Sequence, residues 1–155
     1  MRGKAAPKRV IYPDARYNDP EISKLINYIM TQGKKAVAQK IVYNCLEIVK
    51  TKTAQDPRHI LNKALKMVSP LLEVRSRRVG GANYQIPYQV RGERRFMLAC
   101  RWMIEAARAR KGKPMAEKLA LEIMDTANGE SASVKKKLDV QRMAEANKAF
   151  AHFAR

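Results

Sequence analysis

Apolar residues recur every three or four positions through the first part of the chain, which is the spacing of helices with one buried face. Asp19 and Asp56 are each followed by proline, so each supplies an N-cap and a favoured first helical residue. The first helix should close at Gly33, and the third should stop at Pro70. Between them the apolar face over 36–50 is wide, which predicts a central second helix with several neighbours.

The same spacing returns after the turn signal at 112–114 and predicts a fifth helix that ends at Asn128-Gly129. Ser131 or Ser133 then caps a sixth helix. The predicted inward stripe of this helix consists of Met143, Ala146, Phe150 and Phe153. Three lysines crowd its first turn, Lys135, Lys136 and Lys137. Because lysines there oppose the helix dipole, they indicate either a bound anion or, as the commoner case, side chains in solvent.

Between the third and fourth helices the pattern changes to alternation around Gly80-Gly81, which predicts a β-hairpin at about 72–91. On the returning strand one face carries Tyr84, Ile86, Tyr88 and Val90, and the other carries Gln85, Pro87 and Gln89. Pro87 has no backbone N–H to donate, so the hairpin is a two-stranded ribbon rather than part of a larger sheet. Since such a ribbon is marginal in water, we expect support from the helices at its base and from a bound polyanion.

The helix that follows the hairpin has two different faces. The predicted apolar face consists of Phe96, Cys100, Met103, Ile104 and Ala107, and a separate line of arginines at intervals of seven consists of Arg94, Arg101 and Arg108. One face can pack while the other is free to bind. Arginine suits such a role because its planar guanidinium holds two phosphate oxygens at once and stacks on exposed bases.

These elements predict a mainly α fold, a single domain of about six helices with one protruding two-stranded hairpin between the third and fourth helices. Residues 1–16 lack helical periodicity and are expected to form an extended basic arm, and residues 17–155 are expected to form the helical domain with its hairpin arm at about 72–91. At 155 residues and 46% hydrophobic composition, the chain is large enough for a real core.

A formal net charge of +18 points to nucleic acid first and to an anionic membrane surface second. From Glu73 to Lys113 there are eleven lysines and arginines against three acids, so this stretch carries nearly half of the excess charge. An ordinary surface hairpin with solvated charges is the alternative interpretation. No apolar run is long enough to span a membrane, and the basic N-terminus leads into no signal-peptide core, so we expect a soluble cytoplasmic protein.

The residues that carry most enzyme chemistry are sparse. Cys45 and Cys100 lie in apolar helical patterns without zinc-ligand spacing, which indicates buried, reduced thiols. Neither His59 nor His152 has a nucleophile or a carboxylate pair at a sequence spacing that would indicate a catalytic site. We therefore expect no metal, no cofactor, no small-molecule substrate and no enzymatic activity.

Several long strings can be compared with a known family. They are IYPDARYNDP and GKK near the start, RRVGGANYQIPYQVRGERR and RWMIEAAR in the middle, and VKKKLDVQRMAEANKAFAHF at the end. In this order they resemble the bacterial type of the small-subunit ribosomal protein seven family, over essentially the whole chain. Strings this long and irregular are far more specific than a short motif.

The resemblance implies a helical domain with an extended hairpin, in agreement with the pattern. It implies direct binding to the 3′ major domain of small-subunit ribosomal RNA and a part in assembling the head of the subunit. It also places the hairpin near the exit-site transfer RNA and the messenger RNA exit path, with other small-subunit proteins as neighbours. Some bacterial members also repress translation of their own operon.

Candidate RNA contacts come from two sources. Carried over from the resemblance are Arg75, Arg77, Arg78, Gly80, Gly81, Tyr84 and Gln85 of the hairpin, Arg94, Arg95 and Arg101 of the next helix, and Lys34 and Lys35 of a loop. Basic residues of the arm, the central stretch and the sixth helix add Lys8, Arg9, Arg91, Arg108, Lys113, Lys135 and Lys136. Tyr84 and Tyr88 either stack on exposed bases or pack on their own domain.

Two departures from the family's pattern stand out. Gly92 occupies a position where proline is common, which questions the rigidity of the join between ribbon and helix, and the ending FAHFAR replaces an aromatic-rich one. Neither departure weakens the RNA assignment. The rival functions are a DNA-binding or architectural protein, because a basic ribbon also enters grooves, and a membrane-surface protein.

Overall fold

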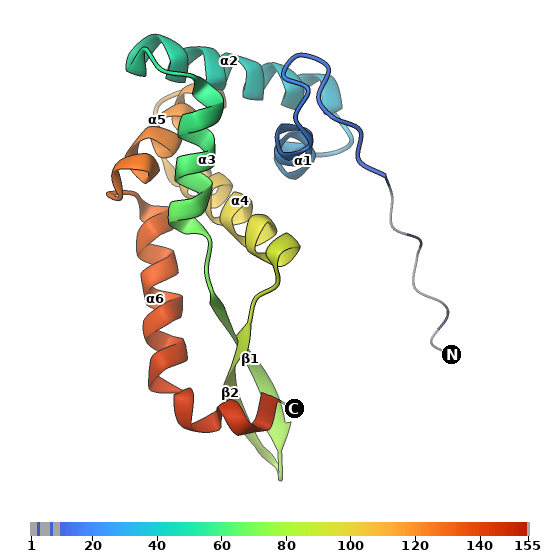
Figure 1. The fold of residues 1–155 in the computed structure, drawn as a ribbon, viewed down its shortest axis with the longest axis vertical. Helices are drawn as coiled ribbons and strands as arrows, with labels where there is room; N and C mark the ends of the chain where they lie inside the picture. The colour runs from blue at the N-terminus through green and yellow to red at the C-terminus, as the bar shows by residue number, and fades with distance from the viewer. Residues whose placement is uncertain (1–2, 4–6, 8–9, 155) are drawn as a thin grey trace. The chain divides into compact units, whose positions relative to one another are not determined.

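The structure is a computed structural model, and it describes residues 3, 7 and 10–154. Within that part of the chain, six α-helices and a short 3₁₀ helix accompany a two-stranded antiparallel hairpin (Figure 1). The elements in chain order are α1 (Pro20–Ile29), α2 (Lys35–Thr53), α3 (Pro57–Val68), β1 (Leu72–Val79), β2 (Ala82–Gln89), α4 (Gly92–Ala109), α5 (Met115–Asn128), α6 (Ala132–Ala146) and η1 (Lys148–Ala154). The mainly α fold and the place of the hairpin are confirmed.

The chain separates into two compact units, Met1–Val42 and Tyr43–Arg155, and the division falls inside α2. The predicted division into an arm over 1–16 and a domain over 17–155 stays a prediction.

In the first unit, Asp14 and Asp19 set the path of the chain into α1. The buried Asp14 carboxylate accepts hydrogen bonds from the backbone N–H groups of Arg16 and Tyr17, at 3.1 and 3.2 Å. Asp19 caps α1 as predicted, because its side chain accepts from the N–H of Glu21 at 2.8 Å. The helix buries Ile22, Leu25, Ile26 and Ile29. It ends before the predicted glycine, which supplies a positive φ of 71° in the turn to α2.

In the second unit the core lies where α3 and α4 pack against α5. Leu61, Met103, Leu119 and Ile123 from these three helices are essentially inaccessible to solvent. Burial of each such side chain stabilises the fold by about 1.5–3 kcal/mol. Asp56 caps α3 as predicted, with its carboxylate accepting from the N–H of Arg58 at 3.0 Å.

Helix α2 has a narrower apolar face than its sequence predicted. Its buried side chains include Ala38 and Val42 in the first unit and Cys45, Leu46 and Val49 in the second. Val37, an apolar residue within the range 36–50 of the predicted face, is 54% exposed.

The end of the chain differs most from the prediction. Ser131 caps α6, since its Oγ accepts from the N–H of Val134 at 3.2 Å. The predicted inward stripe is wrong at Met143, which is 49% exposed, and at Ala146, which is also exposed. Helix α6 ends at this alanine and η1 follows, so the period of 3.6 residues per turn gives way to 3.0. Val134 and Ala144 are the buried apolar residues of α6.

The hairpin pairs Leu72 with Gln89 and Val79 with Ala82 at its two ends. Residues that stand opposite each other share a face, so the register shows which side chains lie on each face of the hairpin. Glu73, Arg75 and Arg77 lie on the face of Tyr88, Ile86 and Tyr84, whereas Ser76 and Arg78 lie on the face of Gln85 and Asn83. Gly80 and Gly81 form the turn with φ of 56° and 93°, which is the backbone of a type I′ turn.

The hairpin is supported along its length as well as at its base. The ring of Tyr84 lies 5.1 Å from that of Phe150 and 5.7 Å from that of Phe153, between centroids. Arg77 Nη1 donates to the backbone carbonyl of Phe153 at 2.8 Å. Segment η1 therefore packs on β2, as Figure 1 shows near the C-terminus. Sequence reasoning placed this support in the basal helices and did not anticipate the contribution of η1.

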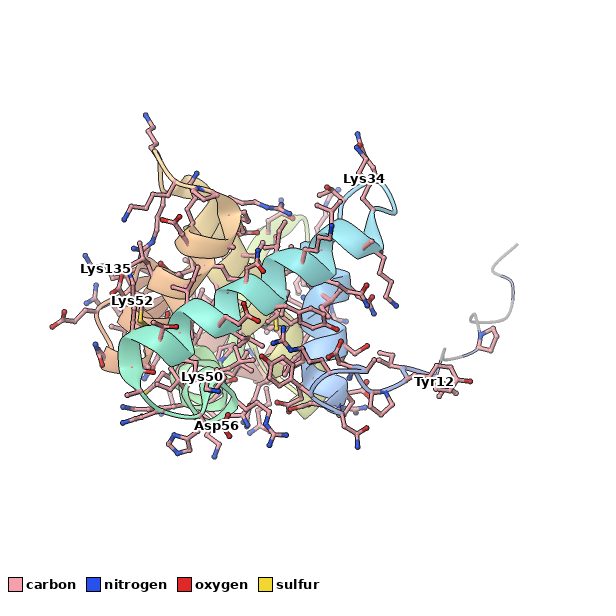
Figure 2. All side chains as sticks on the ribbon, turned by 90° about the horizontal axis from the view of Figure 1, so that it is seen from above. Tyr12, Lys34, Lys50, Lys52, Asp56 and Lys135 are labelled. Atoms are coloured by element: carbon pink, nitrogen blue, oxygen red, sulfur yellow. The ribbon has the colours of Figure 1, made fainter. Side chains whose placement is uncertain are left out.

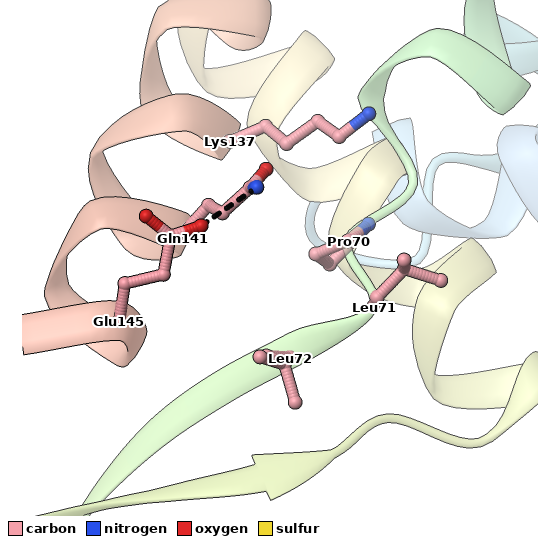
Figure 3. A pocket seen from close by; sticks show the side chains of 6 residues that line it. All are labelled: Pro70, Leu71, Leu72, Lys137, Gln141 and Glu145. Carbon is pink, nitrogen blue, oxygen red and sulfur yellow. Dashed lines mark hydrogen bonds between the residues drawn. The ribbon is translucent and has the colours of Figure 1, made fainter. Parts of the chain in front are cut away.

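At the base, α6 is tied to the chain between α3 and β1. Lys137 Nζ donates to the backbone carbonyl of Met67 at 2.6 Å. The side-chain amide of Gln141 donates a hydrogen bond to the carboxylate of Glu145 at 3.0 Å. Both residues line a recess that Leu71 at the hairpin base also lines (Figure 3). One of the three lysines in the first turns of α6 is thus used within the fold.

Candidate nucleic-acid interface

One carboxylate at the base of the hairpin holds two candidate guanidinium groups. The side chain of Glu73 is only 10% exposed, and it accepts a hydrogen bond from Arg94 Nε at 3.1 Å. It also forms an ion pair with Arg75 in its own strand, whose guanidinium lies 5.5 Å from the ring centroid of Tyr88. The side chains of Arg75 and Arg94 are nevertheless 57% and 43% exposed. The pair is fixed in place while its outer surface faces solvent.

Helix α4 separates its core face from its basic face as predicted. Cys100, Met103, Ile104 and Ala107 of the predicted apolar face are buried, together with Ala99, whereas Phe96 is only half-buried. Arg94, Arg101 and Arg108 are exposed. Arg95 is half-buried, and its Nε is the buried side-chain nitrogen that has no hydrogen-bond partner among the described residues. The exposed line gives α4 a basic surface that continues the one at the hairpin base.

The three ribbon arginines do not share one face. Arg75 and Arg77 project from the face that η1 partly covers, and Arg78 projects from the opposite face. All three are exposed, as is Gln85. Tyr84 is half-buried against the rings of η1, so of the two interpretations of this tyrosine the structure supports packing on its own domain.

The other candidates are spread over separate elements. Arg91 is exposed at the N-cap of α4, and Lys113 is exposed in the loop before α5. Lys135 and Lys136 are exposed near the start of α6, whereas Lys34 and Lys35 belong to the first unit and are exposed at the start of α2. Figure 2 shows the side chains of Lys34 and Lys135. Lys8 and Arg9 lie outside the described residues.

A second carboxylate removes one arginine of the basic stretch from this surface. Arg110 Nη2 lies 2.6 Å from Glu122 and 2.6 Å from Asp125. Burial alone would lower the pKa of Arg110, but hydrogen bonds to Asp125 and Glu122 and the charges of both acids raise it. Glu122 is completely buried and also accepts from Ser133 Oγ at 2.8 Å. This cluster joins α4, α5 and α6 and has a structural role.

Sequence reasoning missed both carboxylates. Glu73 and Glu122 are separated from their arginines Arg94 and Arg110 by 21 and 12 positions. No local pattern predicts such pairs. For Glu73 the one available signal was the scarcity of acids in the strongly basic stretch from Glu73 to Lys113, which makes each acid there a candidate partner; Glu122 lies outside that stretch.

Comparison with known proteins decides the family. The model of the family described as "Ribosomal protein S7p/S5e" matches residues 1–148. The chain belongs to this family. The resemblance seen in the sequence is thereby confirmed.

Curated relatives agree along nearly the whole length. The protein called small ribosomal subunit protein uS7 of Caldanaerobacter subterraneus subsp. tengcongensis is 56% identical over 147 residues, covering 95% of this chain and 94% of the relative. The proteins of the same name from Kosmotoga olearia and Thermosipho africanus are each 54% identical over 153 residues, covering 99% of both chains.

Membership of the S7p/S5e family makes this a structural ribosomal protein and not an enzyme. Both cysteines are buried and neither forms a disulfide, and burial raises the pKa of Cys45 to about 12, so its thiolate is scarce at neutral pH. Among the described residues no group of three or more His, Cys, Asp or Glu could hold a metal ion. No helix in the described part is long and apolar enough to cross a membrane.

Proposed function

We propose that the protein is a structural constituent of the small ribosomal subunit in the cytoplasm and binds the 3′ major domain of small-subunit ribosomal RNA directly. Its relatives are named as small-subunit proteins. In this proposal the protein helps to assemble the head of the subunit, beside other small-subunit proteins. The hairpin lies near the exit-site transfer RNA and the messenger RNA exit path.

The observation that carries RNA binding is the pair of guanidinium groups held by Glu73. Arg75 and Arg94 come from a strand and a helix, yet one nearly buried carboxylate fixes both. Half of each side chain remains exposed, and a fixed guanidinium loses less conformational entropy when it binds a phosphate than a free one does. Arg101 and Arg108 extend the same basic surface along α4.

The mechanism follows from charge and shape. Where RNA helices converge, their phosphates repel each other, and a rigid body with cationic side chains offsets that repulsion while it releases condensed counterions. The major groove of A-form RNA is closed to side chains, so recognition is mainly by shape and backbone, with bases read at loops and bulges. The +18 charge of the chain suits this mode of binding.

A competition experiment tests RNA against the DNA-binding alternative. A folded fragment of the 3′ major domain and duplex DNA of matched length compete for the full-length protein at one fixed salt concentration. We expect the RNA fragment to be preferred by at least about tenfold, because the fixed cations match one folded contour. Equal affinity for both nucleic acids would contradict specific RNA binding.

A charge-removal experiment tests the site. Replacing Arg75, Arg77 and Arg78 together by alanine should lower RNA affinity, and the slope of log affinity against log salt should fall by about two to three if each contacts a phosphate. The matched control replaces Lys50, Lys52 and Lys66, three exposed lysines of α2 and α3, and removes the same charge. If both triple variants behave alike, the hairpin has no special part in binding.

A further inference from the structure

An open recess of about 530 Å³ lies in the second unit where the end of α2, the first turns of α3 and the end of α5 meet. Its lining includes Gln55, His59, Ile60, Lys63, Met124 and Asn128. The α3 residues of the lining, His59, Ile60 and Lys63, lie in the first two turns of that helix, whereas the hairpin follows its last turn. The recess is therefore separate from the candidate interface at Glu73, and its volume falls within the range of small-molecule sites.

The floor of the recess is apolar. Ile60 is 7% exposed, Ala127 is 8% exposed, and Met124 is half-buried beside them in the lining. A thioether and an aliphatic side chain offer a polarisable surface on which a planar ring gains dispersion contacts, and sulfur also interacts favourably with aromatic edges.

The rim carries polar groups whose hydrogen-bonding capacity is unused. His59 and Lys63 are four residues apart on one face of α3, so both reach the same side of the recess. Gln55 and Asn128 contribute amide groups from the ends of α2 and α5. These four residues are exposed, and among the described residues none of their side chains forms a hydrogen bond or an ion pair.

We propose that this recess binds a single unpaired nucleotide of RNA. The base packs on Met124 and Ile60. The side-chain amides of Gln55 and Asn128 form hydrogen bonds with the edge of the base, and Lys63 and His59 bind the phosphate. Amides suit a base edge because each offers both donors and an acceptor. An acidic protein loop would use the cations but leave the apolar floor without a ring to cover it. The inference takes its ligand class from the proposed function, since RNA supplies the nucleotide.

Nucleotide titration tests the recess without ribosomal RNA. Full-length protein labelled with ¹⁵N and ¹³C is titrated with adenosine monophosphate, adenosine, inorganic phosphate or N-acetylglutamate. We expect the largest shifts at the Asn128 amide, the His59 ring and the Met124 methyl group with adenosine monophosphate, and weaker binding of adenosine and of phosphate. No shifts near the recess, equal shifts with phosphate alone, or tighter binding of N-acetylglutamate would each overturn the proposal.

Two variants test the phosphate contact and the base contact separately. Lys63→Ala should weaken adenosine monophosphate about tenfold and adenosine little, whereas Met124→Ala should weaken both about tenfold because it removes the stacking surface. Lys66→Ala is the matched control, since it removes an exposed lysine of α3 that does not line the recess. Helical circular dichroism confirms that each variant is folded. If the three variants bind alike, the recess is not the site.

Binding to the ribosomal RNA fragment then links the recess to the proposed function. Lys63→Ala should lower RNA affinity and reduce the salt slope by about one relative to Lys66→Ala. If the unmodified protein fails to bind the fragment, the proposed function fails, while the titration with free nucleotides still decides whether the recess holds a nucleotide. If the fragment binds and Lys63→Ala changes nothing, the recess is not an RNA contact and the present inference is overturned.

Discussion

Two glutamates in the second unit form ion pairs with arginines, and the two groups of ion pairs have different roles. Glu122 is completely buried and holds Arg110 against α5, together with Asp125 and the hydroxyl of Ser133. Glu73 is nearly buried and holds Arg75 and Arg94 at the foot of the hairpin. The side chain of Arg110 is 31% exposed, whereas that of Arg75 is 57% exposed.

The difference shows that the same residue types serve the fold or the surface according to how many partners surround them. Arg110 bonds two acids, so its donors are largely used within the protein. Arg75 and Arg94 share one acid between them, which leaves donors on both for an outside partner. An excess of basic residues therefore overstates the charge that is available for binding, and the structure shows which arginines to subtract.

Replacement of Glu122 by alanine should give the largest effect. It leaves Arg110 with only Asp125 and removes the acceptor of the buried Ser133 hydroxyl. We expect a loss of about 3 kcal/mol in the free energy of unfolding, or about 6–12 °C in Tm, because one partner of a buried network is removed. Thermal unfolding followed by circular dichroism measures it. Glu105→Ala, an exposed acid of α4, should change Tm little; equal losses in both would mean that the buried network contributes nothing.

Replacement of Phe150 by alanine tests whether η1 or Glu73 orders the hairpin. The ring packs on Tyr84 and is half-buried, so its loss should cost about 1–2 kcal/mol locally. Backbone amides of β2 should then exchange with solvent about 5–30 times faster, while the helices keep their protection. Tyr12→Ala removes a ring that is 78% exposed and serves as the control. Unchanged exchange in β2 would show that the base alone holds the ribbon.

The parts that sequence reasoning predicted and the parts it missed differ in the range of their interactions. Asp19 and Asp56 were predicted as caps because a cap bonds backbone only two residues away. The hairpin was predicted from alternation and two glycines, which are also local signals. The packing of Phe150 on Tyr84 depends on contact between segments 66 residues apart. Met143 and Ala146 were assigned inward from helical spacing alone, whereas the apolar residues that α6 buries are Val134 and Ala144. Local chemistry predicted the elements, and long-range contacts decided which charges remained exposed.

Replacement of Glu73 by glutamine should have a smaller effect on stability than the two changes above. The amide keeps an acceptor for one arginine but loses the charge that holds both, and since the arginines are about half exposed we expect a loss of no more than about 1 kcal/mol. The Arg94 Nε–H should lose its protection from exchange with solvent, which NMR detects directly. Glu93→Gln changes the same charge on an exposed neighbour and should leave this signal unaffected. If Arg94 stays protected without Glu73, another group positions it.

Replacement of Gly92 by proline should give the smallest effect, a gain in stability at the join between β2 and α4. Gly92 is the first residue of α4, and the φ of −73° and ψ of 159° at Arg91 suit a residue before proline. A Cβ atom at Gly92 would meet nothing within 4 Å. We expect a gain of about 0.4–1 kcal/mol in urea unfolding, mainly because the unfolded chain loses conformational freedom. Gly112→Pro is the opposite control, since a φ of 79° excludes proline and should destabilise. A loss of stability in Gly92→Pro would mean that this join needs the freedom of glycine, and the rigidity inferred for Arg94 at the start of the helix would then be overstated.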